Sequence, residues 1–167
     1  VYRMPMGDVR LDKVAIEKLH IDRVHYFDEA HEHEHSLEVH LPFLQAVLGE
    51  FLLIPVVIGD AEPELVAQVL EALWGGPETL IVISSDLSHY LHSDEARAID
   101  ARTCAAIEGF DASRISHHMA CGATPVAGLL LAAKHHGLKV KTLDLRNSGD
   151  TAGNDDFVVG YGAWTFY

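Results

Sequence analysis

Cations are scarce in this sequence. Its 167 residues include 12 Lys and Arg against 25 Asp and Glu, which gives a formal net charge of −13. Binding to a phosphate backbone depends on neutralising phosphates with cationic side chains. The composition therefore disfavours nucleic acid as a partner.

Cysteine and long apolar runs are scarce as well. The two cysteines, Cys104 and Cys121, cannot build a disulfide framework. No apolar run approaches the roughly 20 residues of a membrane span, and the first residues lack the basic-then-apolar order of a signal peptide. We therefore expect a soluble, cytoplasmic protein with no membrane partner.

Hydrophobic residues make up 49% of the chain, which is enough for one sizeable core. We expect a single domain over residues 1–167. The sequence does not begin with Met and opens on a turn-like segment with no strand before it, so we also expect the chain to be incomplete at its N-terminus.

Hydrophobic periodicity predicts helices alternating with strands. The predicted helices cover residues 8–19, 42–48, 62–74, 94–109, 111–119 and 126–136. Apolar runs predict buried strands over 51–58 and 79–83, and alternation predicts strands over 138–145 and 157–167. The order strand, helix, strand around residues 51–83 predicts a right-handed crossover. We expect an α/β fold in which helices cover both faces of a central, mostly parallel or mixed sheet.

Histidine is abundant, with 12 in the chain, and four imidazoles and three carboxylates crowd into residues 31–42. Such a run could be a metal site, a proton-transfer site or a solvated loop. His35 is either an exposed histidine at a helix start or a metal ligand, and Glu38 could orient its ring. His40 faces either the core or the same cleft, whereas His31 and His33 are expected to point to solvent.

A second polar cluster, Ser84-Ser85-Asp86-Leu87-Ser88-His89, directly follows a predicted strand. In parallel sheets, sites form beyond the carboxyl ends of strands. Asp86 and His89 are three residues apart, so the carboxylate could fix the tautomer of the imidazole, or Asp86 could simply cap a helix. The serines do not lie in a G-x-S-x-G motif, which argues against a Ser-His-Asp hydrolase.

The two cysteines differ in their surroundings. Cys104 lies within a predicted amphipathic helix and is expected in the core. Cys121 precedes a glycine and a helix, and the amides at a helix N-terminus favour thiolate chemistry or metal ligation. The sequence contains no CxxC or P-loop motif, so the common zinc-finger and nucleotide-binding motifs are absent.

Three of these segments together resemble the Memo family, also called AmmeMemoRadiSam system protein B. They are residues 34–42 (Glu-His-Ser-Leu-Glu-Val-His-Leu-Pro), 84–89, and 121–126 (Cys-Gly-Ala-Thr-Pro-Val), and their order and spacing match those of the family. Residues 5–8, Pro-Met-Gly-Asp, are similar to its Pro-Leu-Gly-Asp element. The resemblance covers essentially the whole chain and implies a fold similar to that of LigB-like class III extradiol ring-cleaving dioxygenases.

The resemblance also implies roles for individual residues. His35 matches a metal-ligand histidine, Cys121 matches the cysteine that replaces the carboxylate ligand of the dioxygenases, and His89 matches their acid/base histidine. Asp86 is expected to line the same cleft, together with Glu38, His40 and Ser85. The family's first ligand histidine lies in a Pro-His-Ala-Gly-like segment that would precede residue 1, so the metal triad is expected to be incomplete here.

A thiolate in place of a carboxylate softens the site, which favours Cu or Zn beside Fe. We therefore expect a metal-binding protein with a non-haem Fe- or Cu-type His/Cys site and redox or dioxygenase-like activity. The alternative is a binding module that holds a peptide or small molecule in the same cleft without turnover. The sequence identifies neither the substrate nor the oligomeric state.

Overall fold

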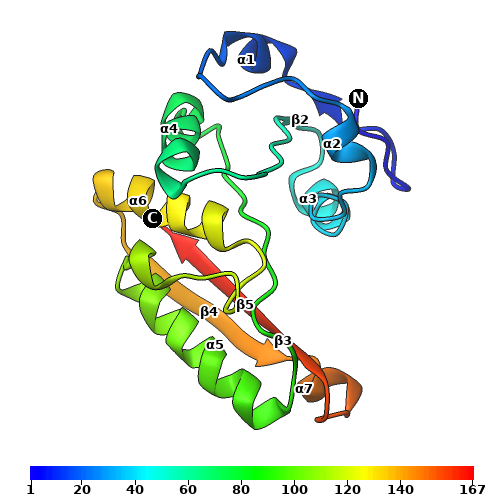
Figure 1. Cartoon of the computed structure of the whole chain (residues 1–167). Helices are drawn as coiled ribbons and strands as arrows, with labels where there is room; N and C mark the ends of the chain where they lie inside the picture. The colour runs from blue at the N-terminus through cyan, green and yellow to red at the C-terminus, as the bar shows by residue number, and fades with distance from the viewer. The chain divides into compact units, whose positions relative to one another are not determined.

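The computed structural model describes residues 1–151 and 153–167 in full, and residue 152 only as part of a helix. By its internal contacts the chain divides into two compact units, Val1–Gly59 and Asp60–Tyr167, whose elements are labelled in Figure 1. The single domain expected over residues 1–167 stays a prediction. Among the described residues, no helix is both long enough and apolar enough to cross a membrane.

The first unit is built from short elements around a small core. Strand β1 (Arg10–Leu11) pairs in parallel with β2 (Leu52–Leu53). The helices are α1 (Lys13–Lys18), α2 (Glu29–Glu32) and α3 (Leu41–Leu48). The buried residues of the core are Met4, Val9 and Leu41, with Tyr2, Leu37, Leu44, Phe51 and Leu53 packed around them.

The helix boundaries in this unit follow from local chemistry. Asp12 accepts a 3.0 Å hydrogen bond from the amide of Ala15 and so caps α1. The helix predicted over 8–19 starts later because β1 occupies the two residues before this cap. Helix α3 has Pro42 in its first turn and ends at Gly49, as the sequence predicts.

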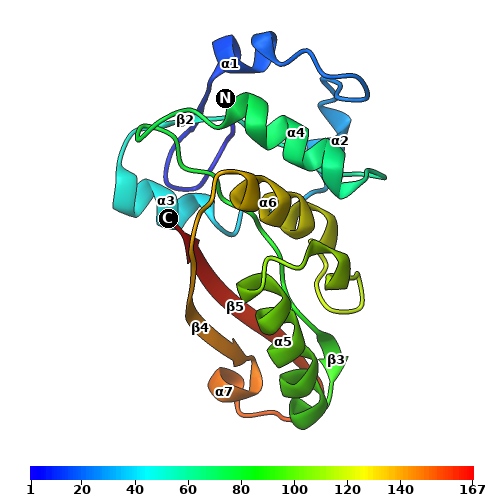
Figure 2. The same cartoon turned by 90° about the vertical axis from the view of Figure 1, so that its left-hand side faces the viewer.

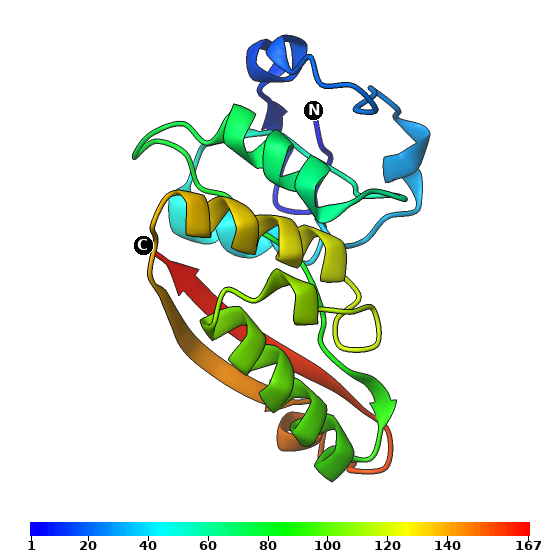
Figure 3. The same cartoon turned by 60° about the vertical axis from the view of Figure 1, so that its left-hand side comes forward.

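The second unit contains a three-stranded antiparallel sheet with the strand order β3-β5-β4. Helix α5 packs across β4 and β5, and α4 lies beside α6 (Figures 2 and 3). In chain order the elements are α4 (Pro63–Leu73), β3 (His89–Leu91), α5 (Ser93–Glu108), the 3-10 turn η1 (Ala112–Arg114), α6 (Ala123–His135), β4 (Val140–Asn147), α7 (Gly149–Ala152) and β5 (Val158–Phe166).

Helix α5 buries one face against the sheet, as its amphipathic pattern predicts. Ala96, Thr103 and Ile107 are buried on this face. Cys104 is also buried, which confirms its expected place in the core, and its Sγ lies 3.4 Å from Oγ1 of Thr142 on β4. The sheet against which α5 packs is a long β4–β5 pairing that runs from Val140 opposite Phe166 to Asn147 opposite Gly160.

The α/β class is confirmed, but two predicted strands are wrong in extent. Of residues 51–58 only Leu52–Leu53 form a strand, and residues 79–83 form none. Leu80 and Val82 are exposed. Apolar composition favours an extended chain, but a strand also needs a neighbour that satisfies its amide and carbonyl groups. The predicted crossover between parallel strands is therefore not seen among the described residues, where the parallel pair is β1–β2.

Candidate functional site

Residues 84–89 lead into the edge of the three-stranded sheet. The amide of Leu87 donates to the carbonyl oxygen of Gly160 at 2.9 Å, and the amide of Gly160 donates to that of Ser88 at 2.8 Å. His89 then begins β3, opposite Val159. Asp86 is followed by this strand, so it does not cap a helix.

A β-bulge lies directly after His89. The pairing register with β5 shifts between His89 and Leu91, and Tyr90 between them has a φ of 57°, in the left-handed region. A bulge of this kind turns a strand and re-aims the side chains beside it. It therefore contributes to the direction in which the His89 imidazole points.

Cys121 is held against Asp86 by two hydrogen bonds. The amide of Cys121 donates to the carbonyl oxygen of Asp86 at 3.2 Å. In return, the amide of Asp86 donates to Sγ of Cys121 at 3.1 Å. Cys121 is exposed and lies one residue before Gly122, the N-cap of α6, as the sequence predicts. The sulfur therefore has an amide donor and remains accessible from solvent.

Ser85 connects the same two segments through its hydroxyl group. Its Oγ accepts a 2.9 Å hydrogen bond from the amide of Gly122 and lies 3.7 Å from Sγ of Cys121. The hydroxyl also donates to the carbonyl oxygen of Asp86 at 2.7 Å. A Cβ on Gly122 would lie 2.7 Å from the carbonyl oxygen of Ser84 and 2.8 Å from Cβ of Ser85. The close approach of these segments thus depends on a glycine at position 122.

The side chains of Asp86 and His89 lie next to each other, as their spacing predicts. Nε2 of His89 is 3.5 Å from Oδ2 of Asp86, and the imidazole is half-buried. One ligand atom from each of Asp86, His89 and Cys121 lies within 4.8 Å of the others. The structure therefore brings together a carboxylate, an imidazole and a thiol from two segments of the sequence.

A buried carboxylate that the sequence analysis missed holds the backbone between Asp86 and His89. Asp100 on α5 is buried, and its Oδ1 accepts a 3.0 Å hydrogen bond from the amide of Ser88. Burial raises the pKa of Asp100, while the hydrogen bonding of Ser88 and the nearby imidazole of His89 act in the opposite direction. Its position in the sequence could have indicated its burial, because Asp100 lies at helical spacing from Ala96 and Thr103, on the buried face of α5.

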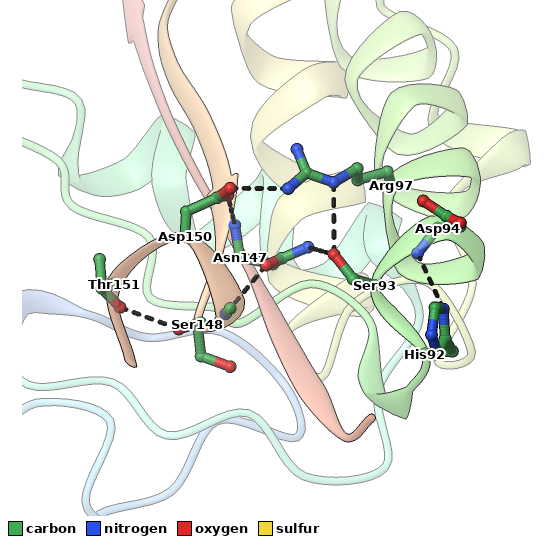
Figure 4. Close-up of polar contacts among 9 residues, drawn as sticks. His92, Ser93, Asp94, Arg97, Asn147, Ser148, Asp150 and Thr151 are labelled. Atoms are coloured by element: carbon green, nitrogen blue, oxygen red, sulfur yellow. Dashed lines mark hydrogen bonds and ion pairs between the residues drawn. The ribbon is translucent and has the colours of Figure 1, made fainter. Parts of the chain in front are cut away.

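A second polar network fixes the end of the sheet beside α5 (Figure 4). Nη2 of Arg97 donates to Oδ1 of Asp150 at 2.6 Å, and Nε donates to Oγ of Ser93. The buried amide group of Asn147 donates to the same Ser93 oxygen at 3.1 Å and accepts from the amide of Gly149. These contacts connect the start of α5, which follows β3, to the end of β4.

His35 lies in the first unit, in the turn before α3, and has a carboxylate partner. Its Nδ1 is 2.9 Å from Oε2 of Glu38. Because an ionised carboxylate only accepts hydrogen bonds, Nδ1 carries the proton in this contact. A neutral ring then has its lone pair on Nε2, which suits a metal ligand. The contact with Glu38 exists as the sequence analysis anticipated, while the metal role of His35 stays a prediction.

The other histidines of residues 31–42 have varied surroundings. His33 is exposed, in line with the sequence analysis. His31, expected to point to solvent, is instead half-buried, and its Nδ1 is out of contact with solvent. His40 is half-buried and directly precedes α3. A role for His40 in a cleft stays a prediction.

Comparison with known proteins places these motifs in a family. A family model described as "Memo-like protein" matches residues 1–165. The chain is 36% identical to a "MEMO1 family protein" of Methanococcoides burtonii and 34% identical to one of Aeropyrum pernix, with 98% of this chain covered in each case. A MEMO1 family protein of Sulfolobus acidocaldarius is 32% identical over 96% of the chain.

The chain spans only part of the length of these relatives, namely 66%, 63% and 61% of them in the same order. The match nevertheless includes the three segments that contain His35, Asp86 with His89, and Cys121, since it extends over residues 1–165. The chain therefore belongs to the Memo-like family.

Proposed function

We propose that this protein binds a redox-active metal ion, Fe or Cu, with Cys121 as a ligand, and that His89 and Asp86 transfer protons in a dioxygenase-like oxidation. The resemblance to the Memo family is the ground on which we propose His35 as a further ligand. The observation that carries the proposal is the convergence of Sγ of Cys121 with the imidazole of His89 and the carboxylate of Asp86 within 4.8 Å. Zn is the further candidate, because thiolate and imidazole also suit it.

The donor set fits such an ion. Sγ of Cys121 accepts a hydrogen bond from the amide of Asp86, and a cysteine sulfur is a common ligand of Fe, Cu and Zn. The thiol is exposed, so an ion can reach it. The contact with Glu38 fixes a tautomer of His35 that leaves Nε2 able to bind.

A bound ion of this class would supply electron transfer and Lewis-acid polarisation of a substrate oxygen. The protein's own contribution is the control of protons. Each ring nitrogen of an imidazole can donate or accept a hydrogen bond according to its protonation, so the side chain of His89 is chemically suited to pass on a proton. Asp86, with Oδ2 at 3.5 Å from Nε2, lies where it can hold the orientation of the ring.

Two features keep this pair in position. The β-bulge at Tyr90 sets the direction of the strand beside His89. The buried carboxylate of Asp100 holds the amide of Ser88, which lies between Asp86 and His89 in the chain. Both features restrict the motion of a proton-transfer group, which is a requirement for efficient acid–base catalysis.

Metal analysis of the purified protein tests the ligand assignment. We expect Cys121→Ala and His35→Ala each to lower the metal content per chain well below that of the wild type. Cys104→Ala and His117→Ala serve as matched controls, since one changes the buried cysteine and the other an exposed histidine outside the motifs, and both should retain the metal. Unchanged metal content in both ligand variants would disprove the assignment.

Oxygen consumption with a catechol tests the reaction class. We expect turnover by the iron- or copper-loaded protein, and we expect His89→Ala to abolish it while leaving the metal content intact. Binding of the catechol or of a peptide without oxygen consumption would instead show that the protein is a binding module. Loss of metal in His89→Ala would make the imidazole a ligand rather than a proton-transfer group.

A further inference from the structure

Glu71 on α4 and the histidine pair at the end of α6 form a second convergent group, remote in sequence from the Memo motifs. Oε1 of Glu71 is 2.8 Å from Nδ1 of His135, and Oε2 is 2.8 Å from Nε2 of His136. Both imidazole nitrogens donate to the carboxylate, and these bonds lower the pKa of Glu71. One donor atom from each residue lies within 4.8 Å of the others.

The packing of the two helices places these residues together. Helices α4 and α6 run side by side in the same direction (Figures 2 and 3). Gly128, near the middle of α6, permits a close approach to the first half of α4, since a Cβ there would lie 2.6 Å from Cβ of Val66. The fixed spacing brings Glu71, in the last turn of α4, against His135 and His136, at the end of α6.

The electrostatics of this place favour a cation. Both helices end here, so the carbonyl-rich, negative ends of two helix dipoles lie beside the group. The carboxylate of Glu71 adds a full negative charge. No cationic Lys or Arg contacts Glu71 in the ion pairs seen among the described residues, where both of its oxygens face imidazoles.

One of the imidazoles is held in a defined orientation. The ring of Trp74 stacks on that of His136 with a centroid distance of 3.9 Å and an angle of 2° between the planes. The side chain of His136 is 30% exposed, whereas that of His135 is 75% exposed. One side of the site is therefore formed by the stacked rings of Trp74 and His136, and the other by the exposed ring of His135.

We propose that Glu71, His135 and His136 form a second metal site, for a divalent ion of the zinc class. Two imidazoles, one carboxylate and an open fourth position constitute a common zinc donor set. A tetrahedral zinc ion with bonds of about 2.0–2.2 Å separates its ligand atoms by roughly 3.3–3.6 Å, so each of the present 2.8 Å nitrogen–oxygen contacts would have to widen by more than about 0.5 Å to admit the ion. The ion would replace the protons that now lie between these atoms, and the exposed ring of His135 has room to adjust.

Zinc stoichiometry in a Cys121→Ser background tests the proposal, because this background removes the thiol of the first candidate site. We expect a Zn²⁺ titration against a chromophoric chelator to show one zinc per chain. His135→Ala/His136→Ala should abolish this binding, and Glu71→Gln should weaken it more than about tenfold, because loss of a direct ligand should cost at least as much as loss of an outer contact. The exposed pair His117→Ala/His118→Ala is the matched control and should keep the zinc.

The tryptophan provides a local readout. Trp74 and Trp164 are the two tryptophans of the chain, so Trp164→Phe leaves Trp74 as the single emitter. Cu²⁺, an open-shell ion that binds such ligands more tightly than Zn²⁺, should quench this emission, and His135→Ala/His136→Ala should abolish the quenching. X-ray absorption of the zinc-loaded Cys121→Ser protein should show nitrogen and oxygen neighbours.

Two results would overturn the proposal. The first is zinc binding that persists unchanged in the folded His135→Ala/His136→Ala variant. The second is the absence of any zinc or copper response in the Cys121→Ser protein, which would mean that the group is a hydrogen-bonded clamp between helices. Glu71→Gln keeps the size of the side chain, so it separates loss of the ligand from loss of the fold.

Discussion

The amide of Asp86 donates a 3.1 Å hydrogen bond to Sγ of Cys121, and the amide of Cys121 donates at 3.2 Å to the carbonyl oxygen of Asp86. This exchange joins two motifs that lie 35 residues apart in the sequence. It also places the sulfur beside the imidazole of His89. The start of α6 and the segment that leads into β3 therefore act as one structural piece, and the chemistry of the site depends on their junction.

The exposure of the two thiols predicts different reactivity. Cys121 is exposed, whereas Cys104 is buried against Thr142. We expect a disulfide reagent such as DTNB to modify one thiol per native chain quickly and the second only on unfolding. Cys121→Ser should remove the fast reaction, Cys104→Ser should retain it, and saturating Zn²⁺ should slow it. A fast reaction in Cys121→Ser would contradict the assignment.

The junction is also sensitive to one added carbon atom. A Cβ at Gly122 meets the Ser84 carbonyl oxygen at 2.7 Å, so Gly122→Ala should lower the free energy of unfolding by about 1–3 kcal/mol. Gly59 has nothing within 4 Å of a built Cβ, and Gly59→Ala should be neutral or stabilising by up to about 1 kcal/mol. Urea unfolding measures both. Equal effects of the two substitutions would show that the close approach at Gly122 carries no cost.

Three helices of the second unit, α4, α5 and α6, could be predicted from sequence because their signals are local. The helix predicted over 111–119 is wrong, since only the 3-10 turn η1 forms there. The periodic apolar pattern and the terminal glycine placed a helix at 94–109, and α5 spans Ser93–Glu108. The strands over 51–58 and 79–83 could not be predicted in the same way. An apolar run sets the preference of each residue, but whether a neighbouring chain pairs with it is a property of the tertiary structure.

The contacts of the candidate site also differ in whether they can be predicted from sequence. The proximity of Asp86 and His89 follows from a spacing of three residues, which a sequence displays directly. The proximity of Cys121 to both is a long-range contact, which local spacing does not determine; the placement of polar segments beside predicted elements suggests it, and the family resemblance implies it. Asp100 was missed because a charge on an amphipathic helix is usually solvated, whereas its register with Ala96 and Thr103 placed it on the buried side.

The raised pKa of Asp100 predicts a stability change with pH. The folded state binds this proton more tightly than the unfolded state, where the pKa is about 3.9. The wild type therefore loses stability as the pH rises from that value through the raised native pKa. Asp100→Asn keeps an acceptor for Ser88 but cannot ionise, so its stability relative to the wild type should increase over this window and then level off. Urea unfolding from pH 3 to 8 checks this, and a pH-independent difference would contradict it.

The lowered pKa of Asp150 predicts a change of stability with pH of the opposite sign. Hydrogen bonds from the amide of Asn147 and from the side chain of Arg97 lower its pKa in the folded state. Its contribution to stability should be complete above the unfolded pKa of about 3.9 and disappear as the pH falls through the lowered native value. Asp150→Asn should therefore be less stable than the wild type at pH 7, and this difference in stability should narrow in acid. Because the ion pair with Arg97 is exposed, the difference should also become smaller in high salt. The control is Asp156→Asn, a substitution of an exposed residue nearby, which should have little effect on stability. A stability difference between Asp150→Asn and the wild type that persists at pH 2 would show that the shape of the side chain, and not its charge, is responsible.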